Sequence, residues 1–167
     1  MHFARVEDAI KSCKAMLGKA PPPELESYLV SYLLIITYAQ YEEIVQKIVE
    51  KRVARIGPDR ELHAFTSSYL RNKKNERRLG KIYVRDLGEI LGRFGKPCKA
   101  KFVAEVANSV PQTQWDSIVT GRHIIAHQGA QPSMRFPDFE TAYAKSQQIL
   151  NAFARACGLT AQERGEL

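Results

Sequence analysis

The residue types best suited to chemistry lie together in residues 121–129, the stretch GRHIIAHQG. Arg122 and His127 stand five positions apart there, in a mostly apolar setting. An imidazole transfers protons near neutral pH, whereas a guanidinium keeps its positive charge. Breaking a phosphodiester bond needs both functions, because protons must move and negative charge grows on the phosphate oxygens. The stretch therefore predicts a site for chemistry on a phosphodiester.

The hydrophobic pattern predicts that this stretch closes a helix. Pro111 precedes the expected helix, Thr113 and Asp116 have the spacing of a capping box, and Gly129 suits the end. On a helical wheel, Arg122 shares a stripe with apolar residues, and the histidines share a more polar stripe. The first stripe comprises Trp115, Ile118, Val119, Arg122 and Ala126, and the second comprises Asp116, Thr120, His123 and His127. We expect Arg122 at the edge of the core, where a charge needs a partner or a cleft.

Arg122 and His127 do not share a face of a straight helix, since five residues turn the chain by about 140° and advance it by about 7.5 Å. Cooperation between them requires one of three arrangements. The arginine side chain reaches around the helix, the last turn is distorted, or the same helix from a second copy of the chain completes the site. A two-fold axis would bring both Arg–His pairs into one groove.

Helical periodicity dominates the rest of the chain, so we expect an all-α fold. The expected architecture is a single-domain helical bundle over residues 1–167, with its core at about 24–157 and one long early helix over 23–56. Further helices are expected over residues 2–17, 59–70, 84–94, 99–109 and 138–157. Trp115 and the tyrosines of the long helix are expected to pack in the core. An inward stripe is expected at Tyr28, Tyr32, Ile35 and Ala39, with Glu42 continuing it.

The composition is that of an ordinary folded chain, with 44% hydrophobic and 26% charged residues, which excludes an intrinsically disordered one. The most apolar run, residues 28–39, is shorter than the roughly 20 residues of a membrane span. The first residues show no apolar signal core. Cys13, Cys98 and Cys157 are far apart and form no C-x-x-C pair, which favours free thiols. We therefore expect a cytoplasmic protein with no membrane partner.

A net charge of +7 favours a polyanionic partner, nucleic acid above all. The strongest basic run spans residues 71–81, and we expect its cations to bind an RNA backbone with salt-sensitive affinity. These cations are Arg71, Lys73, Lys74, Arg77, Arg78 and Lys81. The plainer alternative is a solvated loop, because no aromatic residue is interleaved in the run before Tyr83 to stack on bases.

The segment from Arg122 to His127, with a polar residue directly after the arginine, resembles the R-x4-6-H motif of the HEPN superfamily. The order of the expected elements is similar to that of HEPN proteins of the RiboL-PSP type. These place an aromatic–Glu step on a long early helix, the motif on a later helix, and a closing helix after it. Tyr41-Glu42 would supply the step, and the resemblance covers about residues 28–157.

This resemblance implies a metal-independent endoribonuclease that acts as a homodimer through the motif helix, often as a toxin or an anti-phage effector. It implies an RNA substrate, a cognate antitoxin as a partner, and no cofactor or metal. The implied catalytic residues are His127 for proton transfer and Arg122 as a phosphate clamp. His123 and Glu42 are auxiliary, with His123 orienting the substrate or the partner histidine and Glu42 orienting Arg122. The product would be a 2′,3′-cyclic phosphate.

Each of these residues also has a plainer interpretation. Arg122 could pair with a structural carboxylate, and His127 could be a surface histidine near a helix C-terminus. His123 and His127 have the i, i+4 spacing of helical metal ligands, but neither an H-E-x-x-H pattern nor a clustered third ligand accompanies them. Glu42 could be solvated like Glu43. The alternative function is a catalytically inactive helical module that binds RNA, a nucleotide or a protein partner.

Overall fold

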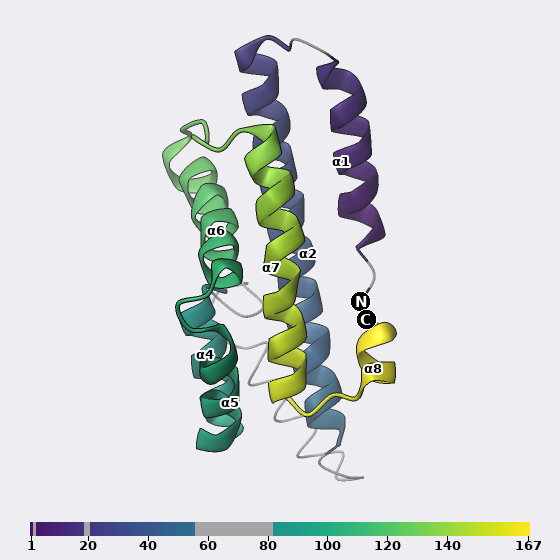
Figure 1. The fold of residues 1–167 in the computed structure, drawn as a ribbon, viewed down its shortest axis with the longest axis vertical. Coiled ribbons are helices and arrows are strands. Elements are labelled where there is room, and N and C mark those ends of the chain that lie inside the picture. The colour runs from purple at the N-terminus through teal and green to yellow at the C-terminus, as the bar shows by residue number, and fades with distance from the viewer. Residues whose placement is uncertain (2, 19–20, 56–81) are drawn as a thin grey trace. The chain divides into compact units, whose positions relative to one another are not determined.

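The regular structure of the chain is entirely helical in the residues that the computed structural model describes, which are 1, 3–18, 21–55 and 82–167 (Figure 1). No strand occurs in these ranges, so the predicted all-α class is confirmed. The expected helix over 59–70 and the basic run over 71–81 lie outside the described residues. The predictions made for them, including the six RNA-binding cations, stay predictions.

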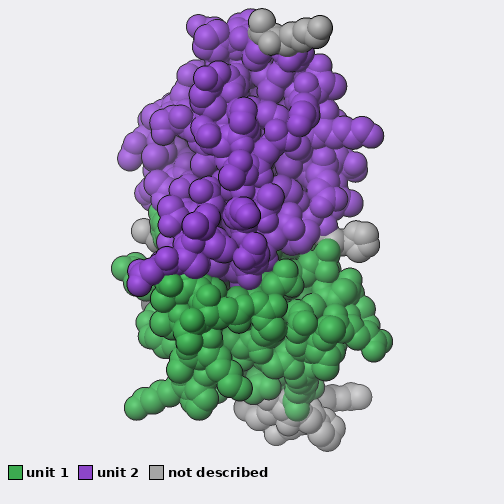
Figure 2. Space-filling view, viewed as in Figure 1, with its two compact units in different colours: residues 1, 42–107, 150–167 green, residues 2–41, 108–149 purple. Residues whose placement is uncertain are grey.

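Two compact units make up the chain, and each is assembled from non-contiguous segments (Figure 2). Unit 2 comprises residues 2–41 and 108–149, and unit 1 comprises residues 1, 42–107 and 150–167. The extent of the domain, 1–167, stays a prediction. Arg122 and both histidines of the motif belong to unit 2.

Unit 2 is built from α1, the first part of α2, α6 and most of α7 (Figure 1). These helices are α1 (Ala4–Leu17), α2 (Pro23–Ala54), α6 (Val110–Gln128) and α7 (Phe136–Ala156). On the surface, the Lys14 ammonium of α1 pairs with the Glu140 carboxylate of α7 at 3.0 Å. Exposed pairs of this kind contribute little free energy, so the core of the unit must hold these helices together.

An aromatic cluster forms that core. Tyr41 of α2 is fully buried and stacks on Trp115 of α6, with ring centroids 4.5 Å apart. Phe3, just before α1, meets both Tyr41 and Tyr143 of α7 edge to face. Ser146 donates its proton to the Tyr143 carbonyl, so the Tyr41 hydroxyl donates to Ser146 Oγ at 2.6 Å. The cluster thereby ties α2, α6 and α7 together and fixes the helix that carries the motif.

Unit 1 is built from the second part of α2, the end of α7 and three shorter helices. These are α4 (Val84–Arg93), α5 (Lys96–Val106) and α8 (Ala161–Gly165). Phe102 of α5 packs edge to face on Phe153 of α7. Helix α8 was not predicted from the sequence, although Thr160 and Glu163 form its capping box and mark its start. Glu163 also pairs with Arg55, the residue just after α2, which anchors α8.

The first part of α2 exposes a stripe that was predicted to face inward. Tyr28, Tyr32 and Ile35 are 64%, 51% and 46% exposed, and Ala39 is exposed as well, so that prediction was wrong. Of the tyrosines expected to pack, Tyr38 and Tyr41 are buried. The reason is that this part of α2 is apolar on nearly every face, and periodicity does not tell which face is covered. Despite this apolar character, no helix in the described ranges is both long and apolar enough to cross a membrane.

The three cysteines are free thiols, as predicted. Cys13 and Cys157 are buried, and Cys98 is partly exposed. Burial raises the pKa of the Cys157 thiol to about 12. The thiolate is the reactive form of cysteine, so this buried group is inert near neutral pH.

Candidate active site on helix α6

The start of α6 is set by a side-chain cap that differs from the predicted one. The Ser109 hydroxyl oxygen accepts a hydrogen bond from the Gln112 N–H at 3.3 Å. Pro111 lies in the first turn, where its missing N–H costs nothing. The predicted capping box of Thr113 and Asp116 is therefore wrong. Thr113 lies inside the helix, and its hydroxyl donates to the Ser109 carbonyl.

The end of α6 follows the prediction. Gly129 has φ +61°, the left-handed conformation that glycine adopts without strain, and its N–H donates to the Ile125 carbonyl. The helix is α-helical without interruption from Val110 through Gln128. A distorted last turn, one of the three arrangements considered for the Arg–His pair, is therefore excluded.

A close approach between α2 and α6 positions the arginine. A Cβ atom built on Gly121 would lie 2.9 Å from Leu34 Cδ1, closer than side chains normally pack. Gly121 and Leu34 are both buried. The absence of a side chain at Gly121 lets α6 approach Leu34 of α2 this closely without displacing the leucine side chain. The approach brings Arg122 beside the next turn of α2, which carries Tyr38.

Arg122 lies on an aromatic platform that was not predicted from the sequence. Its guanidinium carbon is 4.6 Å from the centroid of the Tyr38 ring, and Tyr38 is only 6% exposed. A guanidinium is attracted to the negative face of such a ring, and the attraction strengthens as water is excluded. Arg122 itself is half-buried, so one side of its fixed charge remains accessible. In the sequence, Arg122 and Tyr38 are only an arginine and an aromatic residue on different expected helices, and nothing there indicates that they are in contact.

The two histidines lie together on the exposed end of α6, as predicted. The ring centroids of His123 and His127 are 4.5 Å apart, with 47° between the ring planes. His123 is half-buried and His127 is exposed. Adjacent imidazoles can hold a substrate group between a proton acceptor and a proton donor. The arrangement therefore unites a fixed cation and two proton-transfer groups within about two turns of one helix.

Glu42 is the carboxylate that was predicted to orient Arg122. Glu42 is half-buried and belongs to unit 1, whereas Arg122 belongs to unit 2. The role of Glu42 as the residue that orients Arg122 therefore stays a prediction.

For the alternative of a metal site, no group of three His, Cys, Asp or Glu side chains suited to a metal ion occurs among the described residues. His123 and His127 thus have no third ligand within that part of the chain.

Filling the space at Gly121 is expected to destabilise unit 2. The Gly121→Val substitution should lower the free energy of unfolding by about 1–3 kcal/mol, because the new side chain overlaps Leu34 in a packed interior. Urea denaturation measures the change. Gly165→Val is the control, since a Cβ at Gly165 meets no described atom within 4 Å.

Close contact between Gly121 and Leu34 also predicts non-additive mutants. In the Gly121→Val background, Leu34→Ala should cost less than it costs alone, because the new methyl groups fill the space that Leu34 vacates. Additive losses would contradict a direct contact between the two positions.

Comparison with known proteins identifies a family. The family model described as RiboL-PSP-HEPN matches residues 2–158. This range covers both segments of unit 2 and every residue proposed for the site. Neither the curated proteins nor the solved structures gave a match.

Proposed function

The chain belongs to the RiboL-PSP family of HEPN domains, and on this basis we propose that it is an endoribonuclease. HEPN domains are commonly ribonucleases, so the family match supports an RNA-related role. The observation that carries the proposal is the arrangement on α6. There, Arg122 is fixed on the Tyr38 ring, and two adjacent imidazoles lie at the exposed end of the same helix.

The proposed reaction uses the nucleophile that RNA carries itself. The 2′-oxygen bonds to the adjacent phosphorus, the bond from phosphorus to the 5′-oxygen breaks, and a 2′,3′-cyclic phosphate and a free 5′-hydroxyl result. One group must accept the 2′-hydroxyl proton, and another must protonate the departing 5′-oxygen. His127 is the proposed proton-transfer group because it is exposed at the end of α6. His123, whose ring lies 4.5 Å away, orients the substrate or the second histidine.

Arg122 is the proposed phosphate clamp. Negative charge grows on the phosphate oxygens during the reaction, and a positive group already held in place stabilises it without having to reorganise. The Tyr38 ring holds the guanidinium in this way from one side. The guanidinium edge then remains to donate paired hydrogen bonds to two phosphate oxygens.

The uninterrupted helix leaves two arrangements for cooperation between Arg122 and His127. Either the arginine reaches around α6, or a second copy of the chain supplies the missing partner. We favour a homodimer through α6, because Arg122 is directed toward α2 by its contact with Tyr38, away from the histidine stripe. A two-fold axis would then place two Arg–His pairs at one groove and provide both an acid and a base. Within this proposal the protein is a cytoplasmic toxin or anti-phage effector with a cognate antitoxin.

The direct test is cleavage of mixed cellular RNA by the purified protein in the presence of EDTA. The proposed chemistry predicts cleavage that needs no added metal and product fragments that end in a 2′,3′-cyclic phosphate. Mapping of the product ends measures this. Products ending in a 3′-hydroxyl would contradict attack by the 2′-oxygen.

The contact between Arg122 and the Tyr38 ring predicts different cleavage rates for two substitutions of Tyr38. Tyr38→Leu should lower the cleavage rate by about two- to thirty-fold, the range expected when a cation–π contact is lost. Tyr38→Phe keeps the ring and should retain most of the activity. Single-turnover cleavage rates measure both, with circular dichroism as the check on folding. Equal rates for the two variants would show that the ring contact does not position Arg122.

A second candidate function is a helical module that binds a protein partner or RNA without cleaving it. The exposed stripe of Tyr28, Tyr32 and Ile35 favours this alternative, because contiguous exposed apolar surface often marks an interaction site. RNA binding without strand scission, in EDTA and with added Mg²⁺, would support it over the ribonuclease.

A further inference from the structure

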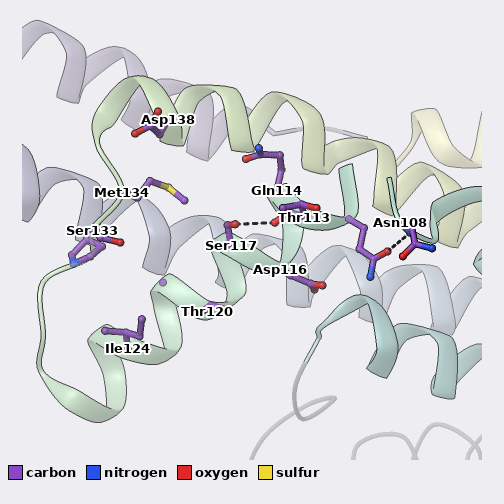
Figure 3. Close-up of a pocket in the computed structure, with 13 residues that line it drawn as sticks. Asn108, Thr113, Gln114, Asp116, Ser117, Thr120, Ile124, Ser133, Met134 and Asp138 are labelled. Carbon is purple, nitrogen blue, oxygen red and sulfur yellow. Dashed lines mark hydrogen bonds between the residues drawn. The ribbon is translucent and has the colours of Figure 1, made fainter. Parts of the chain in front are cut away.

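A polar groove runs along α6 on the side of the histidine stripe, and neither Arg122 nor His127 lines it (Figure 3). Its volume is about 940 Å³. One wall is the polar face of α6, with Thr113, Asp116, Ser117 and Thr120, and the other is the loop over residues 132–134 together with the first turn of α7. In Figure 3, Met134 extends from this loop toward α6.

The loop wall is held in place by the start of α2. The Glu26 carboxylate accepts hydrogen bonds from the Phe136 N–H at 2.9 Å and from the Arg135 guanidinium. The bond from Phe136 holds the pKa of Glu26 below its usual value, so the carboxylate stays ionised and bound near neutral pH. All these residues lie in unit 2. The groove therefore lies within a single unit.

The chemistry of the groove wall disfavours an anion and suits a neutral heterocycle. The described residues that line it include the carboxylates of Asp116 and Asp138 but no Lys, Arg or His, although the chain carries a net charge of +7. A carboxylate such as that of Asp138 repels a phosphate. Met134 and Ile124 add apolar surface, which can cover the face of a ring.

Several polar groups of the wall are hydrogen-bond acceptors. Ser117 donates its single proton to the Thr113 carbonyl at 2.8 Å, and Thr113 donates its own to the Ser109 carbonyl. Each of these hydroxyl oxygens therefore retains only acceptor capacity. Asp138 uses one oxygen to accept from the Arg135 N–H, and the second oxygen is a further acceptor. These acceptors suit a ligand that presents N–H donors, and the amides of Asn108, Gln112 and Gln114 in the same lining can donate as well as accept.

The groove is aligned with the proposed proton-transfer group. Thr113, Thr120 and His127 are spaced seven residues apart, and seven residues bring an α-helix back to within about 20° of the same face. His127 lies beyond Thr120 by about 10 Å along the helix axis. A ligand in the groove would thus lie in line with the exposed imidazole.

We propose that this groove binds an unstacked RNA base that carries an exocyclic amino group, and that it disfavours uracil. The inference rests on the proposed ribonuclease function, because it assigns a base of the same substrate. Single-stranded RNA presents unstacked bases, whose edges side chains read by hydrogen bonds. Adenine, cytosine and guanine each offer the two N–H bonds of an amino group to the acceptors of the wall, whereas uracil has no amino group and offers only a single ring N–H. The sugar–phosphate backbone stays outside, away from the carboxylates and toward His127.

Binding tests the groove separately from cleavage. Short 2′-O-methyl oligonucleotides of adenine, cytosine or uracil lack the nucleophile, so the wild-type protein binds them without cutting, and fluorescence anisotropy measures the affinities. We expect adenine and cytosine oligomers to bind about tenfold more tightly than uracil oligomers, the order of discrimination that one well-placed base contact provides. Equal affinities, or no binding, would overturn the assignment.

Substitutions in the groove wall test whether the wall causes the preference for adenine over uracil. Ser117→Ala removes one acceptor, and Asp138→Asn exchanges one acceptor for a donor while an oxygen remains to cap the Arg135 N–H. Both should bring the adenine-to-uracil affinity ratio down by about threefold or more. Ser12→Ala is the matched control, because Ser12 of α1 makes the same bond to the carbonyl four residues earlier, at 2.9 Å. An unchanged ratio in both wall variants would place the preference elsewhere.

The cleavage and binding results together distinguish failure of the ribonuclease assignment from failure of the groove assignment. If unmodified RNA is not cleaved while the binding preference and its loss in the wall variants persist, the ribonuclease assignment falls and the groove assignment stands. If RNA is cleaved but the oligomers bind equally, the groove assignment falls and the ribonuclease assignment stands.

Discussion

Replacing His127 by alanine is expected to lower EDTA-resistant RNA cleavage by about 10²- to 10⁴-fold, the usual contribution of a positioned proton-transfer group. The exposed position of His127 at the end of α6 means that the substitution removes no core contact. The folded state and its oligomeric state should therefore remain unchanged. Single-turnover rates, circular dichroism and analytical ultracentrifugation measure the three quantities.

Gln128→Ala is the matched control for this substitution. It changes the next residue of the same turn, which is also exposed, and should leave the rate within about twofold because it carries no proposed role. Cleavage that persists in His127→Ala at the wild-type rate would remove His127 from the mechanism.

Cleavage is expected to require both the positive charge of Arg122 and the planar geometry of its guanidinium. Arg122→Ala should reduce cleavage to a similar extent, and Arg122→Lys should restore only a small part, since an ammonium lacks the planar fork that binds two phosphate oxygens and stacks on Tyr38. Arg5→Ala controls for the loss of one positive charge within unit 2, because Arg5 is an exposed arginine of α1 that lies in neither the motif nor the groove lining. Full rescue by lysine would show that Arg122 contributes charge alone.

The largest effect on stability is expected at Trp115. Trp115→Ala should lower the free energy of unfolding by about 3–5 kcal/mol, because it removes a fully buried ring and leaves a cavity beside Tyr41. Trp115→Phe keeps part of the stacked surface and should cost less. Val110→Ala, at a 61% exposed apolar residue of the same helix, should stay within about 0.5 kcal/mol. Urea denaturation followed by circular dichroism measures all three.

The Trp115 substitution also connects the core to the site. Tyr41 stacks on Trp115 and lies one turn beyond Tyr38 on α2, so loss of the ring should loosen the helix pair that holds Arg122. Activity per folded molecule should therefore fall in Trp115→Ala. A destabilised protein with full activity per folded molecule would show that the platform is independent of the aromatic core.

Local signals predicted the helix ends that depend on one residue. Gly129 was predicted to end α6, because a glycine in the left-handed conformation ends a helix independently of the rest of the chain. The start was assigned to Thr113 although Ser109 caps the helix. Both are suitable capping residues, and the position of Pro111 in the first turn was the signal that decides between them.

Contacts between helices could not be predicted in this way. Periodicity showed that Tyr28, Tyr32 and Ile35 share a face of α2 but not whether another helix covers it, and the face proved exposed. The stacking of Arg122 on Tyr38 depends on the distance between α2 and α6, which Gly121 sets through its contact with Leu34. The alignment of His123 and His127 was predicted, because it depends on a single helix.

The discontinuity of unit 2 has a consequence for synthesis on the ribosome. Its core is closed by the hydrogen bond between Tyr41 and Ser146, which are 105 positions apart in the chain. Arg122, His123 and His127 emerge earlier, but the α7 side chains that complete their support are translated afterwards. Folding of the site must wait for this late closure, as is general for contacts of large sequence separation. A nascent chain that stalls before α7 would thus carry every motif residue while lacking the packed core that fixes their positions.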